Sequence, residues 1–121
     1  MATYEDVRRL AMALPGVTEG ARWRNPTWFV GTRGFAWQRP LSKKDRKDLG
    51  DDAPHPDREV LGLVVEDLGV REGLLAEGRP GLFTIPHFAD YAAFLVLLDE
   101  VDEEQLAELL EDAWAVVAPP A

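Results

Sequence analysis

Apolar residues recur at helical spacing near both ends of the chain and predict two amphipathic helices. In the first segment, four positions at i, i+3, i+4 and i+7 form one stripe: Val7, Leu10, Ala11 and Leu14. This stripe predicts a helix over residues 4–14, capped by Thr3 and stopped by Pro15. In the last segment, a second stripe follows an N-cap at Asp102: Leu106, Leu109, Leu110, Ala113 and Val117. We expect this face of the last helix to be buried against a sheet.

Short aromatic-rich runs predict a β-hairpin in the first third of the chain. The runs are residues 27–30 and 35–38, and a glycine-containing turn separates them. Side chains alternate along a strand, so Phe35 and Trp37 are expected on one face and Arg39 on the same face as Trp37. The residues between the first helix and this hairpin have the pattern of a loop.

The middle of the chain alternates between apolar runs and polar breaks. Residues 41–57 read as an exposed loop in which Ser42 can cap a helical turn. The later elements are expected to be a strand at 60–66, a helix from Asp67 to about 77, and strands at 82–85 and 92–98. The last of these strands is apolar on both faces, which is typical of a strand inside a sheet.

This succession predicts an α+β fold. The expected order is α-β-β-β-α-β-β-α, with neither an internal repeat nor a linker along the chain. Short connections favour a two-layer arrangement, in which helices pack on a mostly antiparallel five-stranded sheet. A length of 121 residues suits a single domain, 1–121.

Charge is strongly divided along the chain, although the net charge is -9. Eight cations lie between residues 22 and 47, and the only acid there is Asp45, which gives this stretch a formal charge of +7. They are Arg22, Arg24, Arg33, Arg39, Lys43, Lys44, Arg46 and Lys47. From Pro80 onward there are nine acids and neither Lys nor Arg. The local potential of a surface, rather than net charge, decides what it attracts.

Several chemistries find no support in the residue types. The chain has no cysteine, so disulfides and thiolate metal sites are excluded. The two histidines, His55 and His87, match no metal-ligand spacing, and the single serine, Ser42, lies in no nucleophile motif. We therefore expect no metal, no cofactor and no enzymatic activity. The first six residues lack a signal-peptide pattern and no apolar run is long enough to span a bilayer, so a soluble cytoplasmic protein without membrane contact is expected.

Several short motifs resemble the MmcQ/YjbR family in their order and spacing. They are residues 13–19 (ALPGVTE), 26–30 (PTWFV), 33–36 (RGFA), 83–88 (FTIPHF) and 109–114 (LLEDAW). The resemblance covers nearly the whole chain. It implies a two-layer α+β domain of the double-wing type, similar to type III secretion chaperones, and a DNA-binding label that many members carry. It implies no catalytic residue. Ala115 and Pro120 stand where members often have a basic residue.

Two classes of function follow from these observations. The eight cations alternate with Trp23, Trp28 and Trp37, which predicts binding of DNA or another polyanion through the hairpin and the loop after it. In the opposing interpretation the tryptophans are core and the cations only solvate a rim. The alternative function is a protein-interaction or chaperone-like domain that uses the sheet and the acidic last helix. His87 and Tyr91 could also line a small-ligand pocket.

Overall fold

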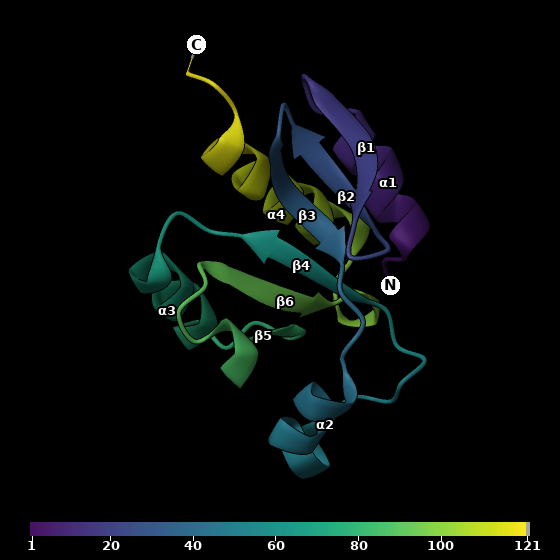
Figure 1. Cartoon of the computed structure of the whole chain (residues 1–121), viewed down its shortest axis with the longest axis vertical. Helices are drawn as coiled ribbons and strands as arrows, with labels where there is room; N and C mark the ends of the chain where they lie inside the picture. Colours follow the sequence, from purple (N-terminus) through teal and green to yellow (C-terminus); the bar gives the residue numbers. More distant parts are fainter. Residues whose placement is uncertain (121) are drawn as a thin grey trace.

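The computed structural model describes residues 1–120, which form one six-stranded antiparallel sheet with helices around it (Figure 1). The strand order is β1-β2-β3-β4-β6-β5. The strands are β1 (Val17–Arg22), β2 (Asn25–Val30), β3 (Arg33–Gln38), β4 (Val60–Val64), β5 (Leu82–Phe83) and β6 (Ala93–Leu97). The α+β class expected from the sequence is confirmed. The expected count of five strands is one too few.

The helices begin where capping residues were expected. They are α1 (Tyr4–Met12), α2 (Lys43–Leu49), α3 (Leu68–Ala76) and α4 (Glu103–Val117). Capping boxes start three of them, in which the N-cap side chain and the side chain three residues later satisfy each other's backbone amides: Thr3 with Asp6, Ser42 with Asp45, and Asp102 with Gln105. Asp67 caps α3. Short 3-10 turns, η1 (Gly50–Asp52), η2 (Pro86–Phe88) and η3 (Leu98–Glu100), complete the chain.

The larger core lies between one face of the sheet and the pair α1 and α4. The apolar stripe of α4 is buried as expected, and it joins Val7 and Ala11 of α1 and Trp28 and Phe35 of the sheet. The described part of the chain contains no helix that is both long and apolar enough to cross a bilayer.

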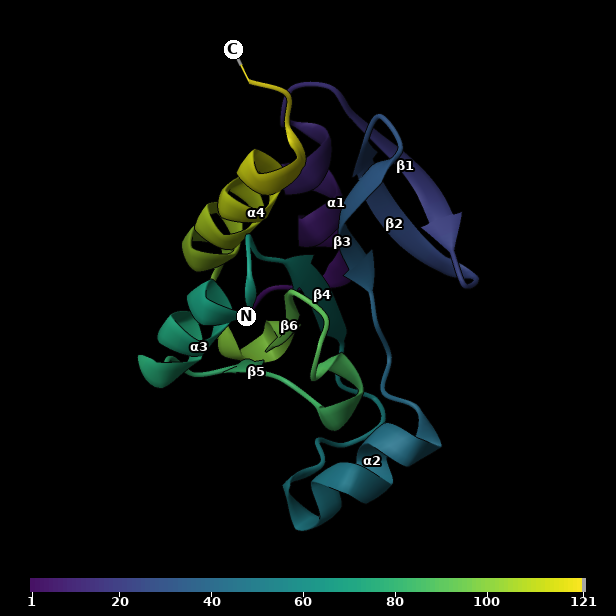
Figure 2. The ribbon, with the colours of Figure 1, turned by 60° about the vertical axis from the view of Figure 1, so that its left-hand side comes forward.

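The opposite face of the sheet is covered over only part of its width. A second cluster there consists of Trp37, Val60, Ile85, Phe88, Ala93 and Leu95, with Leu41 and Leu49 of the α2 region packed against it. Over β1 to β3 the two ribbon views show α1 and α4 on one side, and no helix of the described chain on the other (Figures 1 and 2). On that side the N-terminal three strands are covered by side chains alone, among them Trp37 of β3.

Two local expectations were wrong. Residues 17–22 form the edge strand β1 rather than a loop. Five of the six residues of β1 are exposed, so the strand lacks an apolar signal and is held by its pairing with β2. Phe35 does not share a face with Trp37. The register jumps from Trp28↔Ala36 to Phe29↔Gly34, so Phe35 is an extra residue in a β-bulge and turns toward the α1–α4 core.

Candidate functional site

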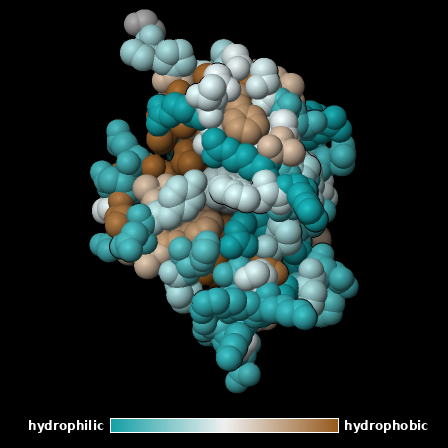
Figure 3. All heavy atoms as spheres, in the orientation of Figure 1, coloured by the Kyte–Doolittle hydropathy of each residue, from teal (hydrophilic) through white to brown (hydrophobic). Residues whose placement is uncertain are grey.

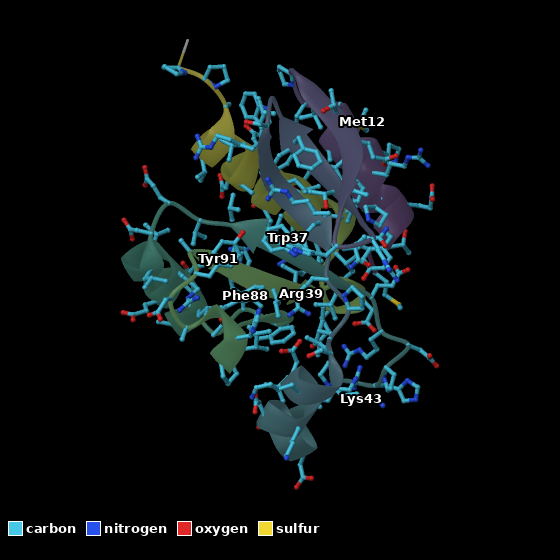
Figure 4. The ribbon with its side chains drawn as sticks, in the orientation of Figure 1. Met12, Trp37, Arg39, Lys43, Phe88 and Tyr91 are labelled. Atoms are coloured by element: carbon cyan, nitrogen blue, oxygen red, sulfur yellow. The ribbon has the colours of Figure 1, made fainter. Side chains whose placement is uncertain are left out.

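A cleft of about 540 Å³ opens on the face of the sheet that α1 and α4 do not cover. Its lining is mostly aromatic, with a few polar side chains: Trp23, Trp37, Phe88 and Tyr91, together with Asn25, Arg39, Pro40, Ser42 and His87. Figure 4 shows Trp37, Phe88, Tyr91 and Arg39 grouped over β4 and β6, with Lys43 of α2 below them. Residues from three distant segments of the sequence, 23–25, 37–42 and 87–91, thus meet in one place.

The floor of the cleft is rigid. Trp37 and Phe88 are 6% and 3% exposed, and their ring centroids lie 6.4 Å apart. Trp37 lies flat across Gly62 of β4, where a Cβ atom would stand 2.5 Å from Trp37 Cε2. Only glycine at position 62 leaves room for this ring position, so the neighbouring strand fixes the floor.

The walls of the cleft are exposed aromatic rings. Tyr91 is 43% exposed and packs edge-on against Phe88, with 5.4 Å between the ring centroids. Trp23 is 75% exposed and occupies the two-residue turn between β1 and β2. Both residues of this turn have left-handed backbone angles, with φ of 49° at Trp23 and 67° at Arg24. Such turns favour Asn-Gly, because other residues are strained there, and strain of this kind tends to occur at functional positions.

Replacing Trp23-Arg24 by Asn-Gly should therefore raise the free energy of unfolding by about 1–2 kcal/mol, because glycine at position 24 removes a Cβ that costs about that much in the left-handed region. Urea denaturation followed by circular dichroism measures the change. Trp23→Ala is the matched control, because it removes the ring but leaves a strained residue, and it should give no gain. A less stable Asn-Gly variant would show that the turn is not strained.

Arg39 closes the α2 end of the cleft. Its Nη1 donates to the Pro40 carbonyl at 2.7 Å and to Asp45 Oδ2 at 3.0 Å, and its guanidinium lies 5.6 Å from the centre of the Phe88 ring. Burial alone would raise the pKa of Asp45, but hydrogen bonds from Ser42 and the charge of Arg39 outweigh it and hold that pKa below its usual value. The carboxylate therefore anchors α2 at neutral pH, and this stabilisation is lost as the pH falls through the folded-state pKa.

The eight cations do not converge on one site. Arg22 and Arg24 flank Trp23 at the turn, Arg39 lines the cleft, and the three lysines and Arg46 belong to α2. Arg33 begins β3, at the opposite end of that strand from Arg39. Asp48 pairs with Lys44, and Arg46 donates to the Pro54 carbonyl. Arg24, in the turn between β1 and β2, and Lys43 and Lys47, on α2, are exposed.

A protein-family model matches most of the chain. The model of the YjbR family matches residues 12–116. The chain belongs to the YjbR family. Two uncharacterised mycobacterial proteins, Rv2570 of Mycobacterium tuberculosis and Mb2600 of Mycobacterium bovis, are each 42% identical to it over 98% of this chain and 91% of their own. The resemblance expected from the sequence motifs is confirmed.

A solved structure supports the fold. DR2400 of Deinococcus radiodurans, which carries a DUF419 domain, superposes with a TM-score of 0.67 at 24% identity, over 97% of this chain and 79% of that one. At this identity the likeness concerns the fold alone. Family membership therefore gives this YjbR protein its architecture, and its chemistry must come from its own residues.

Sequence reasoning found part of the YjbR cleft. His87 and Tyr91, expected to line a pocket, both do so. Of the three tryptophans expected near the cations, Trp28 is core at 1% exposure, Trp37 is the cleft floor, and Trp23 alone is largely exposed. Phe88 and Asn25 were missed. Among residues 1–120, no cluster of three or more His, Asp or Glu side chains could hold a metal ion; that metals and cofactors play no role stays a prediction.

Loop 86–92 of this YjbR protein carries three of the lining residues, and a buried arginine holds it. Arg71 of α3 is 7% exposed. Its Nη1 donates to the carbonyls of Phe88 at 2.6 Å and Tyr91 at 2.8 Å, and its Nη2 donates to that of Ala89 at 3.3 Å. This arginine was not singled out from the sequence, because its partners are backbone atoms 17 to 22 residues away.

Proposed function

We propose that the protein is a non-enzymatic binding module for DNA or another polyanion. The observation that carries the proposal is the placement of cations around an uncovered aromatic cleft. Arg39 lines the cleft, the Arg22 guanidinium lies 6.0 Å from the centre of the Trp23 ring, and the exposed lysines of α2 follow Ser42, which also lines it. Phosphates require several cations on one surface, and bases require exposed rings near them.

The overall negative charge does not oppose this proposal, because the charges are separated in space. The acids of α4 belong to the layer behind the sheet, while the turn and α2 belong to the opposite side (Figures 1 and 2). In the space-filling view, hydrophilic residues gather over α2 at the foot of this face, and less polar residues lie over the sheet above it (Figure 3). A polyanion that runs from the turn to the start of α2 would meet Arg24 and Lys43, whereas the exposed Asp51 and Asp52 lie beyond the far end of α2.

The absence of catalysis is part of the proposal. Ser42 Oγ accepts the backbone N–H of Asp45 at 3.1 Å, which is a capping role rather than that of a nucleophile held by a base. Asp45 is committed to Arg39 and the Ser42 amide. The polar groups of the cleft are thus arranged to hold a ligand.

Binding of a fluorescently labelled single-stranded oligonucleotide should be weak and steeply dependent on salt. Contact with four phosphates predicts a slope of about -3 in log affinity against log salt. The double substitution Lys43→Ala and Lys47→Ala removes two contacts and should flatten the slope by about 1.4. Fluorescence anisotropy between low and moderate salt measures the slope, with the stability of the variant changed by less than about 0.5 kcal/mol.

The control removes the same charge from the other layer. Arg8 and Arg9 lie on α1, so the double substitution Arg8→Gln and Arg9→Gln should leave the slope unchanged. Equal flattening by both pairs would indicate a general charge effect instead of a site. If neither single-stranded nor double-stranded DNA binds at high protein concentration and low salt, the polyanion proposal fails.

A second candidate is a protein-interaction or chaperone-like role. It is favoured by a groove of about 370 Å³ between α3, α4 and β4, whose apolar lining includes Val70 at 46% exposure. Glu66, Glu77 and Asp112 also line it, which suits a basic partner. This groove becomes the leading site if DNA does not bind.

A further inference from the structure

We infer that the aromatic cleft takes one unstacked nucleobase, so that the polyanion is a single-stranded nucleic acid rather than a duplex. This inference rests on the proposed polyanion-binding function and specifies its ligand. It assigns the cleft a task separate from the cations, which hold phosphates whatever the bases are.

The four aromatic rings of the cleft differ in how much of their surface is exposed. The two floor rings, Trp37 and Phe88, are almost fully buried, while Trp23 and Tyr91 rise beside them with much of their surface free. Trp37 and Tyr91 already touch, with 6.1 Å between centroids, so a ligand ring would stack on the exposed sides of Trp23 and Tyr91 rather than between Trp37 and Tyr91. A volume of about 540 Å³ lies within the range of small-molecule sites.

Access to the cleft separates single strands from duplexes. A base in a duplex is stacked between its neighbours and paired along its edge, and it can reach buried rings only after leaving the stack. The floor rings are 6% and 3% exposed, so they lie below the surface that a duplex backbone would contact. An unstacked base of a single strand meets no such cost, and sequence-tolerant stacking on aromatic side chains is how single strands are commonly held.

The polar groups of the cleft favour a neutral, hydrogen-bonding ring with a phosphate attached over the cationic ligands of other aromatic cages. Aromatic cages also bind quaternary ammonium ions, but here the Arg39 guanidinium already occupies the Phe88 face. Within residues 1–120, both hydrogen bonds of that guanidinium come from Nη1, which leaves Nε and Nη2 to serve a base edge or a phosphate. Asn25 donates from its amide nitrogen to the Trp23 carbonyl, so its side-chain oxygen can accept from a ligand.

The turn between β1 and β2 joins the two parts of the site. Left-handed backbone at Trp23 and Arg24 brings the Trp23 ring into the cleft lining, and Arg24 is exposed in the same turn. Arg22 adds a cation that stacks on Phe29, at 5.2 Å from the ring centre, on the open part of the sheet. A strand whose base enters the cleft would therefore have cations within reach of the adjoining phosphates.

The test compares three labelled probes of equal length at low salt: a single-stranded oligonucleotide, an abasic strand with the same phosphates, and a duplex. Anisotropy gives affinity, and tryptophan fluorescence reports stacking. We expect the single strand to bind roughly 5- to 100-fold more tightly than the abasic strand, and to quench tryptophan emission, since one stacked base contributes about that much. Trp23→Ala and Tyr91→Ala should each reduce the single-strand affinity toward that of the abasic strand, and Trp23→Phe should restore most of it.

Met12→Ala is the matched control, because it removes another exposed apolar side chain, on α1 in the other layer, and should change nothing. Equal binding of the single and abasic strands would overturn the base inference and leave the polyanion proposal standing. Tighter binding of the duplex would also overturn it. If no nucleic-acid probe binds, both fail. Binding of a proline-rich peptide instead, lost in Trp23→Ala, would assign the cleft to a peptide.

Discussion

Leu110→Ala should lower the free energy of unfolding by about 2–5 kcal/mol, the range for truncating a buried leucine. Leu110 lies at the centre of the buried face of α4 and is 1% exposed. It packs in the cluster that joins α4 to α1 and to Trp28 and Phe35 of the sheet, so its removal leaves a cavity that neighbours from three elements cannot easily fill. Urea denaturation followed by far-ultraviolet circular dichroism measures the loss.

Two companion variants identify the cause. Glu108→Ala lies on the exposed face of α4 and should change stability by less than about 0.5 kcal/mol. Leu110→Met keeps most of the volume and should cost less than about 1.5 kcal/mol. A loss below about 1 kcal/mol for Leu110→Ala would mean that the site collapses around the smaller side chain, contrary to a close-packed core.

The sequence could predict those elements whose pattern lies entirely within the element itself. The stripes of α1 and α4 and the caps at Thr3, Asp67 and Asp102 are local patterns, and each was found within a few residues of its true position. β6 was predicted to be an inner strand because both of its faces are apolar. In the structure it lies between β4 and β5. Propensity and periodicity decide such elements without reference to the rest of the chain.

The parts that could not be predicted depend on a partner. The edge strand β1 has one inward residue and takes its conformation from β2. The bulge at Phe35 appears only when β3 is paired with β2, and it moves that ring to the other side of the sheet. Periodicity assumes that neither strand has an extra residue, so it assigned Phe35 to the wrong face.

The candidate site was likewise only partly predictable from the sequence. The cations and the pocket residues His87 and Tyr91 were visible in the sequence, but their separation into a turn, a cleft and α2 was not. Trp23 and Trp28 look equivalent in the sequence, because both lie within a few residues of Arg22 and Arg24. Only strand pairing shows that one occupies an exposed turn and the other the core.

The sheet also explains how an acidic protein can present a cationic surface. α4 packs on one face and holds five of the nine acids of the C-terminal third in that layer, while the connections β1–β2 and β3–β4 carry Arg24 and the cations of α2. Screening at physiological salt, over about 8 Å, limits the influence of the charges of one layer on the other. The separation of charge along the chain thus becomes a separation of charge in space.

Arg71 links the stability of the fold to the shape of the cleft. Four carbonyl oxygens of residues 88–93 accept hydrogen bonds from its guanidinium, among them those of Phe88 and Tyr91. The Phe88 and Tyr91 carbonyls also accept from the amides of Tyr91 and Ala93, so the bonds from Arg71 add to the backbone hydrogen bonds of the loop and fix it to α3. Because Arg71 lies behind the loop and the aromatic side chains line the cleft, it acts as a positioning residue for the site.

Arg71→Met should therefore lower the free energy of unfolding by about 3–5 kcal/mol, because four hydrogen bonds from a buried guanidinium to backbone carbonyls are lost. Arg71→Lys keeps the charge but loses the forked geometry, so it should fall between Met and the native residue. Glu72→Gln, exposed on the same helix, is the control. Hydrogen exchange separates positioning from general destabilisation: in Arg71→Lys the amides of residues 88–93 should lose protection well before those of β4. Uniform loss across the sheet would assign Arg71 to the core alone, whereas selective loss with weaker single-strand binding would show that α3 determines where Phe88 and Tyr91 stand.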